Sequence, residues 1–89
     1  MKLNYKIELQ ELGEMVVAVI RDTNTQQVVH AYKMNETGAF IINQINAGYK
    51  EEMIAKHISE EFSVSLELAT QETNEFIDML KNKGIVGQE

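Results

Sequence analysis

Hydrophobic and polar residues follow one spacing in the first part of the chain and a different spacing in the second part. Residues 5–9 alternate between apolar and polar, which predicts a half-buried strand. Residues 15–20 form an unbroken apolar run rich in β-branched side chains, which favours a central strand covered on both faces. Residues 27–34 alternate again and predict a third strand. Short polar turns join the three, so we expect an antiparallel sheet with the third strand at an edge.

Apolar residues recur at helical spacing in the second part of the chain and predict three helices. The first follows an N-cap at Asn35 and ends near Gly48, and the second spans about residues 50–62. The third begins after a cap at Ser65 and ends near Gly84. The apolar stripe of the second helix is expected to consist of Met53, Ile54, Ile58 and Phe62. That of the third helix is expected to consist of Ala69, Thr73, Phe76, Ile77 and Leu80.

The last two predicted helices and the short turn between them form a helix-turn-helix pair beside a small sheet. The predicted fold class is therefore α+β and winged helix-turn-helix-like, with a three-stranded antiparallel sheet followed by three helices. The chain has 89 residues, no proline and no linker-like stretch, so residues 1–89 are expected to form a single domain. Ile85 and Val86 follow the last helix, and we expect them to fold back under the body.

Residues 34–40 join the strand part to the helical part. The small residues Gly38 and Ala39 lie where the first helix must pass close to another element. We expect this segment to fix the end of the edge strand relative to the helices. In that role it sets the width of a groove and does not bind a ligand itself.

The composition excludes most catalytic chemistry. The chain has no cysteine, so it cannot build a disulfide, a thiolate metal site or an iron–sulfur cluster. Its two histidines, His30 and His57, are far apart in sequence, and no nucleophile or phosphate-loop motif is present. We therefore expect a protein that is not an enzyme and that carries no metal or cofactor. No apolar run approaches the length of a membrane span, so we expect a cytoplasmic protein without membrane contact.

The formal net charge is −6 at pH 7, which favours cationic partners and disfavours phosphate backbones. In a DNA-binding helix-turn-helix, the second helix of the pair enters the major groove. Here that helix carries acidic residues along most of its length, namely Glu67, Glu72, Glu75 and Asp78. We therefore expect no nucleic-acid partner. A winged-helix nucleic-acid-binding or regulatory module stays as the alternative function, on topology alone.

The third strand and the third helix supply the candidate binding site. At about 100° per residue, Leu68, Glu72, Met79 and Lys83 fall on one flank of the third helix, beside Phe76. Leu68 and Met79 either only widen the core or form an apolar shelf that faces the free edge of the third strand. Such a shelf suits an extended peptide, and the edge also suits pairing with a second copy in a homodimer. The strand residues of this predicted peptide-binding site are Val28, Val29, His30, Ala31, Tyr32 and Lys33.

A further pattern runs from residue 6 to residue 86. Its parts, in order, are Met34-Asn35-Glu36-Thr37-Gly38-Ala39, Ile54, Phe62-Ser63-Val64, Ala69, Glu72, Phe76, Leu80 and Gly84-Ile85-Val86. At this spacing the chain resembles the PqqD-like family, whose members are recognition elements for ribosomally synthesised and post-translationally modified peptides. Family members often have Trp where this chain has Ile42 and Leu where it has Met34, and both replacements keep apolar character.

The resemblance implies a fold of three strands followed by three helices. It also implies that the chain binds the leader segment of a precursor peptide, which adds as a strand between the third strand and the third helix. The implied partners are this precursor (leader) peptide and a radical S-adenosylmethionine (radical SAM) or other peptide-modifying enzyme. Because the chain has no cysteine to hold the iron–sulfur cluster of such an enzyme, it would act in trans as a non-catalytic adaptor.

Overall fold

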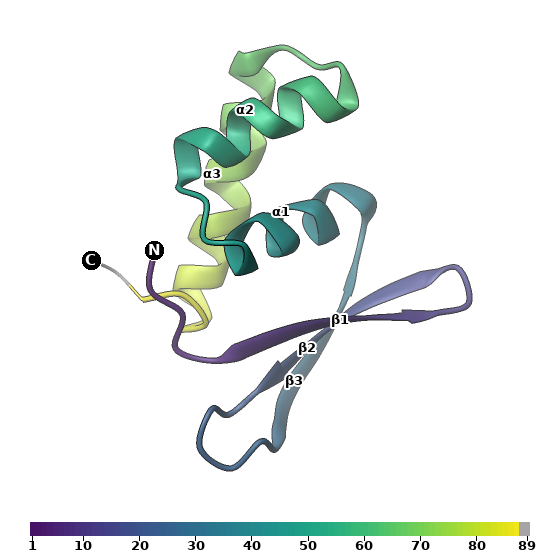
Figure 1. Ribbon diagram of the computed structural model, residues 1–89, viewed down its shortest axis with the longest axis vertical. Coiled ribbons are helices and arrows are strands. Elements are labelled where there is room, and N and C mark those ends of the chain that lie inside the picture. Colours follow the sequence, from purple (N-terminus) through teal and green to yellow (C-terminus); the bar gives the residue numbers. More distant parts are fainter. Residues whose placement is uncertain (88–89) are drawn as a thin grey trace.

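The computed structural model describes residues 1–87, in which three strands precede three helices along the chain (Figure 1). The strands are β1 (Lys6–Leu12), β2 (Met15–Arg21) and β3 (Val28–Met34). The helices are α1 (Glu36–Asn46), α2 (Glu51–Phe62) and α3 (Leu66–Asn82). The strands form an antiparallel sheet in the order β1-β2-β3. The predicted α+β class and the predicted order of elements are confirmed.

β2 is the central strand, as its unbroken apolar sequence predicts. Ala18 on β2 lies between Leu9 of β1 and Tyr32 of β3 in the register of the sheet. Ala18, Val19 and Ile20 are all buried, so the second half of β2 is covered on both faces. β1 continues three residues beyond its predicted end, because its pairing with β2 runs on to the turn.

A hydrogen-bonded turn joins β2 to β3. The Asp22 carboxylate accepts hydrogen bonds from the backbone N–H groups of Thr25 at 3.0 Å and Asn24 at 2.8 Å. These bonds favour the charged form, so they lower the pKa of Asp22 below its ordinary value, and Thr25 has the larger effect. The turn thereby holds the chain where it reverses into the edge strand.

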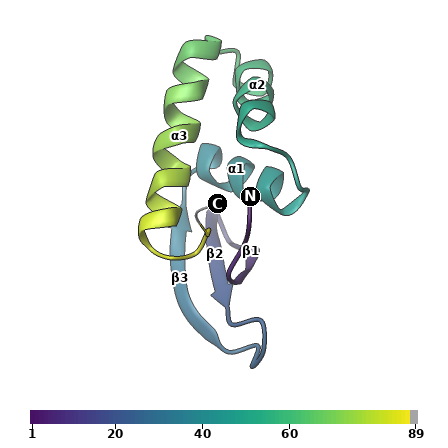
Figure 2. The same ribbon diagram turned by 90° about the vertical axis from the view of Figure 1, so that its left-hand side faces the viewer.

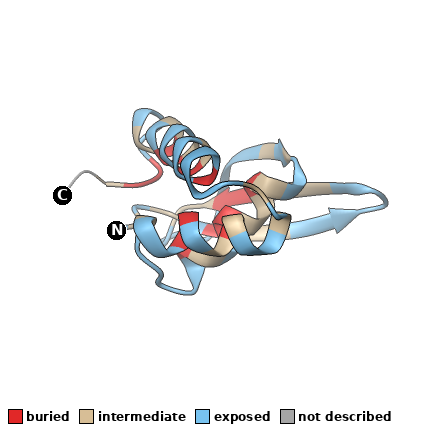
Figure 3. Ribbon diagram, turned by 90° about the horizontal axis from the view of Figure 1, so that it is seen from above, coloured by how far each residue is buried: buried red, intermediate tan, exposed pale blue. Residues whose placement is uncertain are grey.

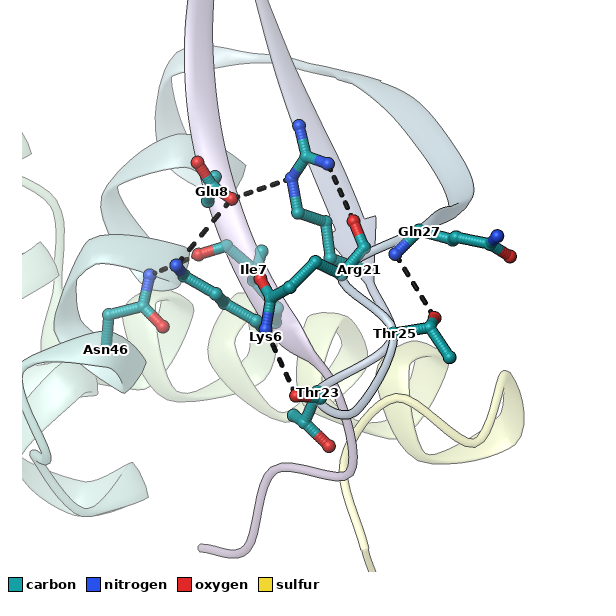
Figure 4. A network of polar contacts seen from close by, with 9 residues as sticks. Lys6, Ile7, Glu8, Arg21, Thr23, Thr25, Gln27 and Asn46 are labelled. Atoms are coloured by element: carbon teal, nitrogen blue, oxygen red, sulfur yellow. Dashed lines mark hydrogen bonds and ion pairs between the residues drawn. The ribbon is translucent and has the colours of Figure 1, made fainter.

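Polar side chains tie the sheet to the end of α1 (Figure 4). Arg21 Nε on β2 donates to Glu8 Oε1 on β1 at 2.8 Å, and Lys6 Nζ lies 3.9 Å from the same oxygen. Asn46 Nδ2, at the last residue of α1, donates to the backbone carbonyl of Ile7 at 2.9 Å. The C-terminal end of α1 is thus fixed to the first strand.

The first and third helices begin at their predicted caps. Asn35 Oδ1 accepts from the backbone N–H of Gly38 at 2.7 Å, and Ser65 Oγ accepts from that of Leu68 at 3.1 Å. The second helix follows Lys50, whose side chain makes no capping hydrogen bond. The caps therefore define where α1 leaves β3 and where α3 leaves the turn after α2.

α2 buries most of its predicted stripe, with Phe62 half-buried against the core, and Met53 is the exception. Ile54 and Ile58 are buried as expected, and Ala55 is buried with them. Met53 is 41% exposed, so its prediction as a core residue was wrong. The packed face of α2 is centred between Ile54 and Ala55, and Met53 lies more than 90° round the helix from that centre, at about 100° per residue.

The helices lie on one side of the sheet, and buried residues occur both in the sheet and on the helices (Figure 3). α1 contacts all three strands, while α2 and α3 pack on each other. The stripe predicted for α3 is buried at Ala69, Thr73, Ile77 and Leu80, with Phe76 half-buried at its edge. Figure 2 shows that the C-terminal half of α3 comes down beside β3.

The two ends of the described chain lie side by side (Figure 1). Leu3 and Val86 form an antiparallel bridge, and the backbone N–H of Asn4 donates to the carbonyl of Ile85 at 3.0 Å. Ile85 and Val86 are both buried, which confirms that they fold back under the body. This contact anchors the C-terminal end of α3 close to the sheet.

Candidate functional site

β3 has a free edge. Within residues 1–87, β3 pairs with β2 on one side and with no strand on the other. Most of its side chains are exposed, and only Tyr32 and Met34 are half-buried against the core. The backbone N–H and C=O groups along this edge can therefore pair with an added strand.

One flank of α3 lies beside β3. Phe76 and Met79 are half-buried, so part of each packs against the core and part remains exposed. One turn after Met79, Lys83 Nζ lies 4.8 Å from the centroid of the Tyr32 ring, within the range of a cation–π contact. The C-terminal end of α3 therefore contacts β3 through the side chain of its C-cap residue. We call the free edge of β3 and the facing flank of α3 the β3–α3 groove.

A cavity of about 340 Å³ extends the β3–α3 groove to the point where α3 passes the start of α1. Its lining residues are Asn35, Thr37, Gly38, Ile41, Glu72, Glu75, Phe76 and Met79. A Cβ atom added at Gly38 would lie 3.1 Å from Phe76 Cε1 and 3.3 Å from Met34 Sδ. These contacts are tighter than most Cβ contacts in proteins, so a larger residue at position 38 would require Phe76 or Met34 to shift by a few tenths of an ångström.

The β3–α3 groove carries opposite charges at two places along its length. Glu72 and Glu75 line the cavity beyond the end of β3, and Lys83 lies over Tyr32 on β3. Glu75 accepts a hydrogen bond from Gln71 Nε2 at 3.2 Å, and neither glutamate is joined to a basic group within residues 1–87. A ligand in the groove therefore meets carboxylates near α1 and an ammonium group near the middle of β3.

Comparison with known families connects this geometry to a defined group of proteins. A family model described as "Coenzyme PQQ synthesis protein D (PqqD)" matches residues 14–86. The chain belongs to the PqqD family. The resemblance seen in the sequence is thereby confirmed, and the PqqD match contains both sides of the β3–α3 groove.

Two solved structures share this PqqD fold. One is "TbiB1 in Complex with the TbiA(beta) Leader Peptide", with a TM-score of 0.74 and 20% sequence identity over 100% of this chain and 98% of that chain. The other is "Lasso peptide synthetase B1 complexed with the leader peptide", with a TM-score of 0.71 and 17% identity over 99% of this chain and 100% of that chain. At these identities the likeness establishes the fold. A search of curated proteins found none that matches the chain.

The predicted site residues do not all lie together in the PqqD fold. Tyr32 meets Lys83 and stacks on His30 with ring centroids 5.6 Å apart. The other predicted strand residues, Val28, Val29, Ala31 and Lys33, are exposed along β3. Glu72, Phe76 and Met79 line the cavity. Leu68 is 42% exposed near the start of α3 and is not part of the cavity lining.

Sequence reasoning did not include five residues that line the cavity. These are Asn35, Thr37, Gly38, Ile41 and Glu75. The segment of residues 34–40 was expected only to set the width of the groove, and the structure makes part of it a wall of the cavity. The small residue at position 38 indicated a close approach, but the sequence did not reveal that Phe76 is the side chain approached.

The second histidine of the chain, His57, lies outside the β3–α3 groove. His57 Nδ1 is hydrogen-bonded to Gln44 Oε1. The Tyr49 ring packs edge-on against the imidazole, with the two ring centroids 4.8 Å apart. These contacts hold the imidazole in the helical layer. Among residues 1–87 no group of three or more His, Cys, Asp or Glu residues is arranged to hold a metal ion. No helix in the same range is long and apolar enough to cross a membrane.

Proposed function

We propose that this PqqD-family chain is a non-catalytic adaptor that binds the leader segment of a ribosomally synthesised precursor peptide and presents the peptide to a modifying enzyme. In this proposal residues 1–89 act as a single recognition domain. The observation that carries it is the free β3 edge beside the half-buried Phe76 and Met79. Two proteins of the same fold, TbiB1 and a lasso peptide synthetase B1, are described as complexes with leader peptides, which supports the same ligand class here.

The leader adds to β3 as a further strand. Its backbone pairs with the free edge of β3, and its apolar side chains pack on Phe76 and Met79. Four to six backbone hydrogen bonds at about 1 kcal/mol each and two apolar anchors at about 2 kcal/mol each give about 8–10 kcal/mol. Ordering the peptide costs about 2–5 kcal/mol. The difference corresponds to micromolar or weaker binding, as a carrier that must release its peptide requires.

The chemistry belongs to a separate enzyme in this proposal. A chain without cysteine cannot hold an iron–sulfur cluster, so a radical SAM reaction must take place on a partner protein. We propose a radical SAM protein as that partner, following what the family resemblance implies. The adaptor raises the local concentration of the precursor at the enzyme and needs no reactive side chain for this.

The proposed function predicts a rate effect in trans. A modifying enzyme and a precursor peptide encoded in the same gene cluster are mixed with and without the chain, and modified product is followed by mass spectrometry. We expect the chain to raise the rate at limiting peptide by about tenfold or more, because tethering raises the effective concentration. A precursor with a scrambled leader is the control and should gain nothing. Equal rates for the native precursor with and without the chain would contradict the adaptor role.

A further inference from the structure

The cavity lies directly beyond the last residue of β3. Met34 ends β3, and Asn35 and Gly38, which follow it in the chain, line the cavity. Met34 Sδ lies 3.3 Å from the position of a Cβ added at Gly38, so the strand end and the cavity wall are in contact. A peptide that pairs with β3 and continues past Met34 therefore carries one of its side chains to the mouth of the cavity.

The lining of the cavity has an apolar part and an acidic part. Ile41, Phe76 and Met79 supply apolar surface next to Gly38. Glu72 and Glu75 supply two carboxylates, and neither is joined to a basic group within residues 1–87. The complementary side chain has a long aliphatic stem and a cationic end, because its stem covers the apolar wall while its end meets the carboxylates.

We propose that the cavity selects a Lys or Arg side chain of the bound leader and so fixes the register of the peptide on β3. This inference rests on the proposed function, since it assigns one subsite of the same groove. The net charge of −6 adds a long-range attraction for a basic segment. Lys83 lies over Tyr32 on β3, outside the cavity lining, and disfavours a cation there. The carboxylates of the cavity and the cation of Lys83 together restrict the basic residue to the cavity.

A peptide selection tests this subsite without a known ligand. A displayed library of random twelve-residue peptides is selected against the full chain and against the double variant Glu72→Lys/Glu75→Lys. The matched control is Glu60→Lys/Glu61→Lys, which makes the same two charge reversals at exposed residues of α2 outside the β3–α3 groove. We expect the native chain and the control to enrich Lys or Arg at one fixed position, and the double variant to enrich Asp or Glu there.

A neutral variant keeps the test decisive where two charge reversals disturb folding. The affinity of one enriched peptide is measured on the native chain and on Glu72→Gln/Glu75→Gln, and thermal unfolding checks that both are folded. We expect the basic peptide to lose about three- to tenfold on the neutral variant. The same peptide with norleucine in place of its Lys or Arg should bind both proteins equally.

The outcomes separate this inference from the proposed function. Failure of the native chain to enrich any peptide would contradict the proposed function itself. Enriched peptides that protect β3 amides from exchange but carry no fixed basic residue would overturn the cavity assignment and leave the adaptor role intact. An equal loss for the basic peptide and its norleucine analogue on the glutamine variant would also overturn it, because the carboxylates would then not act on the cation.

Discussion

Replacing Ile54 with alanine is expected to lower the free energy of unfolding by about 2–5 kcal/mol. Ile54 is 0% exposed and lies on the face of α2 that packs on α3. The substitution removes buried methyl and methylene groups and leaves a space that the surrounding side chains fill only in part. The loss is a large share of the total of about 5–15 kcal/mol that holds a small domain folded. Urea unfolding followed by circular dichroism measures it.

The adjacent residue provides a matched control. Met53→Ala removes a side chain of similar size from the same turn of α2, but Met53 is 41% exposed. We expect a change of no more than about 0.5 kcal/mol. If Met53→Ala destabilised the chain as much as Ile54→Ala, Met53 would be a core residue as the sequence spacing predicted, and its observed exposure would be wrong.

Replacing Met79 with aspartate is expected to weaken leader binding by about thirty- to a hundredfold. The change removes one apolar anchor worth about 2 kcal/mol, and it puts a carboxylate where the bound peptide excludes water. The thermal stability should fall little, because Met79 is half-buried at the groove and an aspartate there can turn towards water. Isothermal titration calorimetry with a synthetic leader peptide measures the affinity, and thermal unfolding checks the fold.

Leu68→Asp is the matched control for this prediction. Leu68 lies on the same helix, is 42% exposed and is outside the cavity lining. We expect a loss in leader affinity of less than about threefold, in line with a surface substitution outside the contact. If Met79→Asp bound the leader peptide as tightly as the native chain, α3 would not be part of the binding site. Equal losses in both variants would show that the site extends to Leu68 in the first turn of α3. The sequence analysis included Leu68 in the site from its angle round the helix.

Local signals in the sequence predict the elements of this fold well. Asn35 and Ser65 carry side chains that cap helices, and both accept the expected backbone hydrogen bonds. The apolar run of β2 predicts a central strand because only a strand with neighbours on both sides buries such a run. Met53 was misassigned because apolar spacing alone does not show which side of α2 meets α3.

The cavity depends on contacts between distant parts of the chain, so local patterns predict it only in part. Phe76 and Met79 were found from the angle of their side chains round α3. The angle does not give the position along the helix axis, which is why Leu68 was grouped with them although it lies near the other end of α3. The part played by Gly38 follows from the crossing of α1 and α3, and this crossing is a property of the tertiary structure.

The most direct test of the central claim is a nuclear magnetic resonance titration of the labelled chain with the precursor peptide encoded beside it. Strand addition predicts chemical-shift changes in residues 28–33 of β3 and residues 72–83 of α3, with slowed amide exchange along β3. The chemical shifts of α2 residues, including those around His57, should stay unchanged and act as the internal control. Binding that shifts α2 and leaves β3 and the second half of α3 unperturbed would contradict peptide recognition in the β3–α3 groove.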